Sequence, residues 1–253
     1  MDRVEFCRKK YEELFGQVPV GGDDPEFMAI LQRFVFGEVF QEDTLTDELR
    51  ELITIVVLTV NQTLPQLKAH AGTALRIGIQ PVKIKEAVYQ CAPYIGFPKT
   101  LNGIAQVNAV LQEAGVSLPL PPQGTVTEEN RLSEGLATQK AIFGDTIDVM
   151  RAKAPADEKQ LQDDLSALCF GDFYTRGGLD IPTRELLTFC MLIAHGGCEN
   201  QVKGHIQGNL RVGNGRNILL AAIRQCLLYI GFPRTLNALA CLDEICPAGS
   251  SSC

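Results

Sequence analysis

The chain has 253 residues, of which 45% are hydrophobic and 21% are charged, and its formal net charge is −7 at pH 7. This composition is typical of a globular protein with a large core and excludes disorder over most of the length. Nucleic-acid binding is not expected either, because it requires a dense cluster of lysine and arginine, and none occurs in this acidic sequence.

The beginning of the chain, MDRVEFCRKKYEELFG, is charged from its second residue and lacks the apolar segment of a signal peptide. The most apolar run, residues 52–60, has nine residues, whereas about 20 are needed to cross a bilayer. It is therefore predicted to be a buried helix or strand. The nine cysteines show no CxxC spacing, which favours reduced thiols over a disulfide framework. We expect a cytoplasmic protein without a membrane partner.

The two halves of the chain repeat one another. YIGFPKTLN at 94–102 returns as YIGFPRTLN at 229–237, 135 residues later (229 − 94). QLKAH at 66–70 is matched by QVKGH at 201–205, and an earlier FGEVF at 36–40 is matched by FGDFY at 170–174. Self-similarity at a fixed spacing predicts an internal duplication.

The boundary between the copies is predicted at a proline-rich segment. Prolines 119, 121 and 122 lie in SLPLPPQGTVT, and proline disfavours helix and supports an extended linker. The predicted organisation is a first repeat at 1–116, a linker at 117–127, a second repeat at 128–246 and a flexible tail at 247–253.

Each copy is predicted to be helical. The first has a helix ending at Gly78, and in the second the helix at 201–213 ends at Gly213, where a left-handed C-cap is expected. Residues 181–194 begin with Pro182 and Thr183, which favour a helix start. The run at 217–233 has too few polar residues for a surface helix and is expected to be central.

The repeated nonapeptide has a predicted local role. Its Gly-Phe-Pro ends the central helix, because proline excludes helical geometry at the preceding residue. Its Thr-Leu-Asn is predicted to begin the next helix with a capping hydroxyl. In this interpretation the nonapeptide is a structural corner used once in each repeat.

Each copy also carries a glutamate followed by a glutamine and a histidine four residues apart. Residues at this spacing share a helix face. The set is Glu51, Gln66 and His70 in the first copy and Glu185, Gln201 and His205 in the second. A carboxylate beside an imidazole can orient the ring or raise its pKa, and both suit general acid–base catalysis. The alternative is a structural histidine held in the core by its glutamate.

These segments, together with TRGGLDIPTRELL at 175–187, resemble the carboxymuconolactone decarboxylase family, which includes the alkylhydroperoxidase D-like proteins. The resemblance implies an all-α fold of two tandem repeats and chemistry without a cofactor or a metal. It also implies a homo-oligomer, a trimer of two-repeat chains equivalent to a six-unit ring.

The decarboxylase branch of the family implies a carboxy-lyase for a small anionic unsaturated lactone or a related acid. Glu185 and His205 would be the acid–base pair, and Gln201 would donate a hydrogen bond to the developing enolate. Arg176 would hold the substrate carboxylate, and His195 would be a secondary contact. The first copy has no arginine matching Arg176, so the second copy is predicted to carry the better site.

The peroxidase branch implies a different chemistry, based on a CxxCxxxH motif. Here only Cys198 of that motif is present, and Gln201 replaces the second cysteine. A thiol peroxidase or disulfide reductase that uses Cys198 is therefore an alternative. A non-catalytic ring protein that binds a small acid is another.

Overall fold

The computed structural model describes residues 2–16 and 22–250, and within these ranges the chain forms helices and no strand. The predicted all-α fold is confirmed. None of the helices in the described ranges is both long and apolar enough to span a membrane. Residues 251–253 of the predicted tail lie outside the described residues.

The first repeat is built around five helices, which are α3 (Asp47–Asn61), α4 (Leu64–Arg76), α5 (Pro81–Tyr89), α6 (Ala92–Ile95) and α7 (Phe97–Glu113). The apolar run at 52–60 is thus a helix, and it is buried along its whole length. Thr46 caps α3 by accepting a hydrogen bond from the backbone of Leu49. Gly78 follows α4 with φ of 89°, as the predicted left-handed C-cap requires.

The second repeat has three corresponding helices, which are α11 (Ile181–His195), α12 (Glu199–Arg211) and α13 (Arg216–Ile245). Asp180 caps α11, and Gly213 follows α12 with φ of 98°. Helix α13 is kinked at Gly231, which has a non-helical φ of 71°. The kink divides α13 into parts that correspond to α5–α6 and to α7 of the first repeat.

The nonapeptide corner differs in one detail from its prediction. Gly96 precedes α7, and Pro98 lies in its first turn, where the missing amide of proline costs nothing. The helix therefore begins three residues earlier than predicted, and Thr100 lies inside it. The Thr100 hydroxyl donates to the Gly96 carbonyl at 3.0 Å, and Thr235 donates to Gly231 at 2.8 Å. Neither threonine is a cap.

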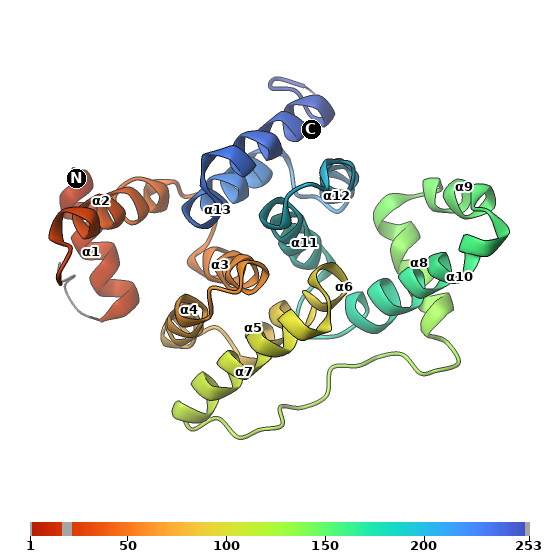
Figure 1. Ribbon diagram of the computed structural model, residues 1–253, viewed down its shortest axis with the longest axis horizontal. Coiled ribbons are helices and arrows are strands. Elements are labelled where there is room, and N and C mark those ends of the chain that lie inside the picture. The colour runs from red at the N-terminus through yellow and green to blue at the C-terminus, as the bar shows by residue number, and fades with distance from the viewer. Residues whose placement is uncertain (1, 17–21, 251–253) are drawn as a thin grey trace.

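The two repeats share one core. Helices α3 and α11 pack against each other at the centre of the molecule (Figure 1), and one apolar cluster contains buried residues of both repeats. Arg50 of α3 donates to Gln225 at 2.9 Å, and Arg184 of α11 donates to Gln90 at 2.9 Å. Each repeat therefore binds the other through the same pair of residue types.

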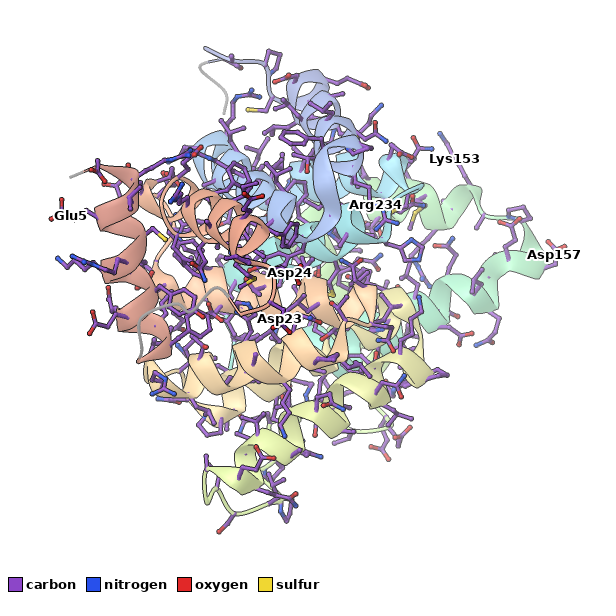
Figure 2. The ribbon with its side chains drawn as sticks, turned by 60° about the vertical axis from the view of Figure 1, so that its left-hand side comes forward. Glu5, Asp23, Asp24, Lys153, Asp157 and Arg234 are labelled. Atoms are coloured by element: carbon purple, nitrogen blue, oxygen red, sulfur yellow. The ribbon has the colours of Figure 1, made fainter. Side chains whose placement is uncertain are left out.

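Additional helices flank the core on opposite sides (Figure 1). Those beside the first repeat are α1 (Arg3–Phe15), α2 (Pro25–Val35) and the short η1 (Val39–Gln41). Those beside the second are α8 (Arg131–Phe143), α9 (Thr146–Lys153), η2 (Ala156–Glu158), α10 (Lys159–Asp164) and the π-helical η3 (Leu165–Tyr174). Figure 2 shows Glu5 on the outer side of α1, and Lys153 and Asp157 at the far end of the second group.

The segment between α7 and α8 contains no helix and runs along the edge of the molecule (Figure 1). Leu118 and Leu120 in this segment pack against the shared core. The linker is therefore attached to the body of the protein.

Candidate active site

A glutamate and a histidine meet where α11 packs against α12. Nδ1 of His205 lies 2.6 Å from Oε1 of Glu185. Glu185 is fully buried, and the His205 side chain is 12% exposed. Because Glu185 engages Nδ1, Nε2 is the ring nitrogen available to a substrate.

The second oxygen of Glu185 is held as well. The Tyr174 hydroxyl donates to Oε2 of Glu185 at 2.9 Å and lies 2.6 Å from the Thr188 hydroxyl. Burial, followed by the charge of Glu185, raises the pKa of Tyr174 well above its usual value. The phenol therefore stays protonated at neutral pH and acts as a hydrogen-bond donor. With both oxygens bound, the Glu185 carboxylate has a fixed orientation.

Gly208 on α12 makes room for this carboxylate. A Cβ at this position would lie 2.9 Å from Cε1 of Phe143 and closer still to Oε1 of Glu185. Any side chain here would displace the carboxylate or the ring. The sequence signal was a glycine inside a helix, which usually has a packing reason.

Tyr94 of the first repeat also reaches His205. The two rings are edge to face at 6.0 Å, and the Tyr94 hydroxyl lies 3.3 Å from Sγ of Cys169. In the other direction, Tyr229 of the second repeat contacts the His70 ring at 6.0 Å. The nonapeptide is therefore more than a corner, because its tyrosine completes the site of the opposite repeat.

A cavity of about 420 Å³ lies beside His205. Gln201, one turn before His205 on α12, lines it together with Tyr94, Phe143 and Cys169, and most of the other lining residues are apolar. Burial raises the pKa of the Cys169 thiol to about 12, so this thiol is neutral at neutral pH. Tyr94, Tyr174 and Cys169 were not among the sequence candidates.

The equivalent site in the first repeat has the same pair but less support. Nδ1 of His70 lies 2.9 Å from Oε2 of the buried Glu51. Oε1 of Glu51 is buried and has no hydrogen-bond partner among the described residues. Phe40 occupies the position that corresponds to Tyr174, so the donor is missing. Gln66 is exposed to solvent, as Gln201 is in the second repeat, so the two glutamines do not distinguish the sites.

Two predicted substrate contacts lie away from the His205 cavity. Arg176 directs Nε and Nη2 at the carboxylate of Glu86, at 2.9 to 3.1 Å, and lines a different cavity. His195 is exposed at the end of α11, with Nδ1 3.1 Å from the carbonyl of Gly196. Neither residue lines the cavity beside His205. The pairing of Arg176 could not be read from the sequence, because Glu86 comes from the other repeat.

Cys198 is also separate from His205. It lines a small pocket together with Arg234 and Cys241, and its Sγ donates to the Leu192 carbonyl at 3.3 Å. Burial, followed by the charge of Glu199, raises the pKa of Cys198. In the part of the chain that the structure describes, no three His, Cys, Asp or Glu side chains gather closely enough to hold a metal ion.

The fold and the site define an all-helical protein of two fused repeats, each with a buried glutamate–histidine pair. The sequence model of the carboxymuconolactone decarboxylase family matches residues 25–109 and 159–244, one match in each repeat. The chain therefore belongs to this family, as its sequence motifs predicted.

A relative described as 4-carboxymuconolactone decarboxylase, from Acinetobacter baylyi, is similar to part of the chain. It is 26% identical over 92 residues, which cover 36% of this chain and 69% of the relative.

Proposed function

We propose that the protein is a cofactor-free carboxy-lyase that decarboxylates a small unsaturated lactone acid, of the kind named in its relative, at the cavity beside His205. The observation that carries the proposal is the 2.6 Å contact between His205 and the fully buried Glu185 at the wall of this cavity. A histidine oriented by a buried carboxylate can hold a proton for a substrate.

In the proposed reaction, the bond between the carboxylate and the substrate ring breaks and carbon dioxide leaves. The bonding electrons stay on the ring and spread into the unsaturated ester as an enolate. Nε2 of His205 then gives its proton to carbon, and Glu185 stabilises the imidazolium before the transfer. Solvent restores the proton after the product leaves. In this proposal the amide of Gln201, which lines the cavity, donates a hydrogen bond to the enolate oxygen.

The surroundings of His205 favour this charge movement. A carboxylate is a localised charge and loses solvation in a largely apolar cavity. The enolate spreads the same charge over several atoms, so the apolar wall penalises it less. Arg176 and His195 have no part in this proposal, because both lie outside the cavity.

The thiol alternative has less support. Cys198 lines another pocket, and burial raises its pKa and that of Cys169, which disfavours the reactive thiolate in both.

Decarboxylation of a panel of unsaturated lactone acids, including 4-carboxymuconolactone, tests the proposal. With the active substrate, Glu185→Gln is expected to lower kcat/KM by about 100-fold or more, and Glu51→Gln is the matched control. Normal turnover by Glu185→Gln would contradict the proposal. Binding without turnover in the unmodified protein would support the binding-protein alternative, and peroxide turnover lost in Cys198→Ser would support the thiol alternative.

We also propose that three chains form the oligomer, equivalent to a six-unit ring. Each repeat exposes a large apolar pair at equivalent positions, Phe97 with Leu101 and Phe232 with Leu236, and such side chains often mark an interface. Light scattering should give three times the chain mass of 27.7 kDa. Phe97→Glu combined with Phe232→Glu should give a monomer. A monomeric unmodified chain would contradict this proposal.

A further inference from the structure

A second cavity, of about 450 Å³, lies between the first repeat and the linker. Its walls come from α5, from α7, from the linker residues 118–123 and from Arg176 of the second repeat. It shares no lining residue with the cavity beside His205. Its polar lining includes Lys85, Glu86 and Asn108 of the first repeat, together with Gln112, Gln123 and Arg176.

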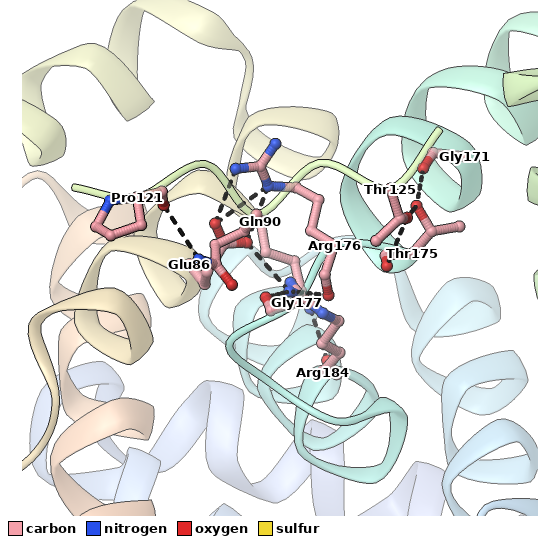
Figure 3. Close-up of polar contacts among 10 residues, drawn as sticks. Glu86, Gln90, Pro121, Thr125, Gly171, Thr175, Arg176, Gly177 and Arg184 are labelled. Carbon is pink, nitrogen blue, oxygen red and sulfur yellow. Dashed lines mark hydrogen bonds and ion pairs between the residues drawn. The ribbon is translucent and has the colours of Figure 1, made fainter. Parts of the chain in front are cut away.

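The charges around this cavity do not balance. Glu86 accepts hydrogen bonds from Arg176 and, at 3.1 Å, from Arg184 (Figure 3), so one buried carboxylate serves two guanidinium groups. Lys85 adds a third cation next to Glu86 in the sequence. Among the residues that line the cavity, Lys85 and Arg176 are positively charged and Glu86 is negatively charged, in a chain whose net charge is −7.

Lys85 is the group without a counter-ion. It is only 8% exposed, and within residues 2–16 and 22–250 no carboxylate lies within 4 Å of its ammonium group. Its Nζ donates to Oδ1 of Asn108 at 2.6 Å and lies 5.0 Å from the centre of the Tyr89 ring. A neutral amide and a ring face do not offset the cost of burying a charge as an anion would.

Arg176 presents a second donor to the same space. Its guanidinium lies 5.5 Å from the centre of the Tyr89 ring, so Tyr89 contacts both Lys85 and Arg176. Glu86 engages Nε and Nη2 of Arg176, which leaves Nη1 for a ligand. An anion beside Tyr89 would thus meet two cations.

The pairing of Glu86 with the arginines has a purely structural explanation. Arg176 and Arg184 come from the second repeat and Glu86 from the first, so the cluster joins the repeats. Gly178 brings this loop against α5, because a Cβ there would lie 2.8 Å from Val82 and 2.9 Å from Glu86. This explanation does not include Lys85, which contacts none of these groups through an ion pair.

We propose that this cavity binds a small organic carboxylate, whose anionic group lies between Lys85 and Arg176 and whose apolar part lies against the linker. Leu118, Leu120 and the prolines at 119, 121 and 122 supply that apolar wall. Polar groups at one end and apolar side chains around the rest are usual for sites of small ligands. The inference does not depend on turnover at His205.

The test measures the melting temperature of the full chain in benzoate, succinate or inorganic phosphate, against chloride at equal ionic strength. Benzyl alcohol is the uncharged control for benzoate. At ten times its dissociation constant, a bound carboxylate should raise the melting temperature by roughly 3–6 °C. The increase in melting temperature should level off in the way expected for a single binding site as the carboxylate concentration increases. If neither carboxylate gives a saturable rise, or if phosphate alone does, the proposal is wrong.

Three variants, measured in the same assay, show whether the carboxylate binds at this cavity. Lys85→Gln keeps a donor for Asn108 but removes the charge, so it should abolish the rise and should not lower the melting temperature in chloride. Lys68→Gln is the matched control, because Lys68 is exposed and pairs with Glu113, and it should retain the full rise. His205→Gln should retain it too. A rise that survives in Lys85→Gln, or is lost in His205→Gln, would overturn the assignment.

Discussion

The two repeats contain the same glutamate–histidine pair in different surroundings. In the second repeat, both oxygens of Glu185 are bound, one by His205 and one by Tyr174. In the first, Phe40 replaces the tyrosine, and one oxygen of Glu51 is buried without a partner among the described residues. Pairing alone therefore does not distinguish the sites, whereas the donor to the second oxygen does.

This difference indicates how a duplicated chain can specialise. Each repeat keeps a helix pair that brings its glutamate to its histidine, and each takes a tyrosine from the other. Because the repeats share one core, the first remains necessary for the site of the second even without activity of its own. Tyr94 is the direct contribution of the first repeat to the second site.

Among the variants that test this comparison, Gly208→Ala is expected to have the largest effect on kcat/KM. Its added methyl group would meet Phe143 at 2.9 Å and lie closer still to Glu185, so Glu185 must move away from His205. We expect kcat/KM to fall by about 100-fold, because small misplacements of catalytic groups have costs of this size.

Gly72→Ala, on α4 of the first repeat, is the control, since a Cβ there meets nothing within 4 Å; Gly72 lies one residue before Thr73, the position that corresponds to Gly208. It should stabilise the protein by about 0.5–1 kcal/mol and leave kcat/KM unchanged. Steady-state kinetics and thermal unfolding measure both effects. Equal kinetics for the two variants would show that the close approach at Gly208 does not position Glu185.

The second-largest effect is expected from a substitution that makes the second site resemble the first. Tyr174→Phe removes the donor to Glu185 and should reduce the free energy of unfolding by about 1–3 kcal/mol, because a buried carboxylate oxygen loses its partner. We expect kcat to fall by roughly tenfold. Chemical denaturation and initial rates provide the two measurements.

The reverse substitution, Phe40→Tyr, sharpens the same comparison. The new hydroxyl is expected to donate to the unpaired oxygen of Glu51 and to increase the free energy of unfolding by about 1 kcal/mol. If Phe40→Tyr instead lowers the free energy of unfolding, the phenylalanine ring has a stabilising role of its own at this position. Its guanidinium neighbour, Arg50, which lies 4.9 Å from the ring centre, would then be the first contact to examine.

Two substitutions with smaller expected effects on kcat/KM test whether each repeat contributes a tyrosine to the site of the other. Tyr94→Phe keeps the ring against His205 and removes only the hydroxyl, so kcat/KM should fall by about three- to tenfold. Tyr229→Phe makes the same change at the site of the first repeat and should alter kcat/KM by less than about twofold. If Tyr229→Phe is the more damaging variant, the first site is the more active one.

The smallest effect is expected at Cys198. Cys198→Ser should leave decarboxylation unchanged within about twofold, because the thiol lies outside the cavity. Its pKa is raised, so the thiolate forms only at high pH, and alkylation by iodoacetamide should be slow at pH 7 and accelerate as the pH rises. Fast labelling at pH 7 accompanied by loss of activity would contradict this.

Several features could be predicted from local sequence alone. Gly78 and Gly213 mark helix ends because few other residues adopt positive φ there. The spacing of Gln201 and His205 places both on one helix face, and the structure puts both at one cavity. The repetition of Glu185 and His205 in the first copy suggested that the two side chains pair.

The remaining features depend on long-range packing. Tyr94 reaches His205, and Arg176 reaches Glu86, only because the two repeats exchange contacts across a shared core. No local pattern reports such an exchange. The capping role predicted for Thr100 was wrong for a more local reason, because Pro98 allows the helix to begin earlier.

The most direct test of the account compares His205→Gln with His70→Gln on one decarboxylation substrate. Both variants remove an imidazole that a buried glutamate holds, so their effects on folding should be similar. The account predicts that His205→Gln lowers kcat/KM by at least 100-fold and that His70→Gln lowers it by less than about threefold. Equal losses, or a larger loss for His70→Gln, would contradict the claim that the second repeat carries the catalytic site.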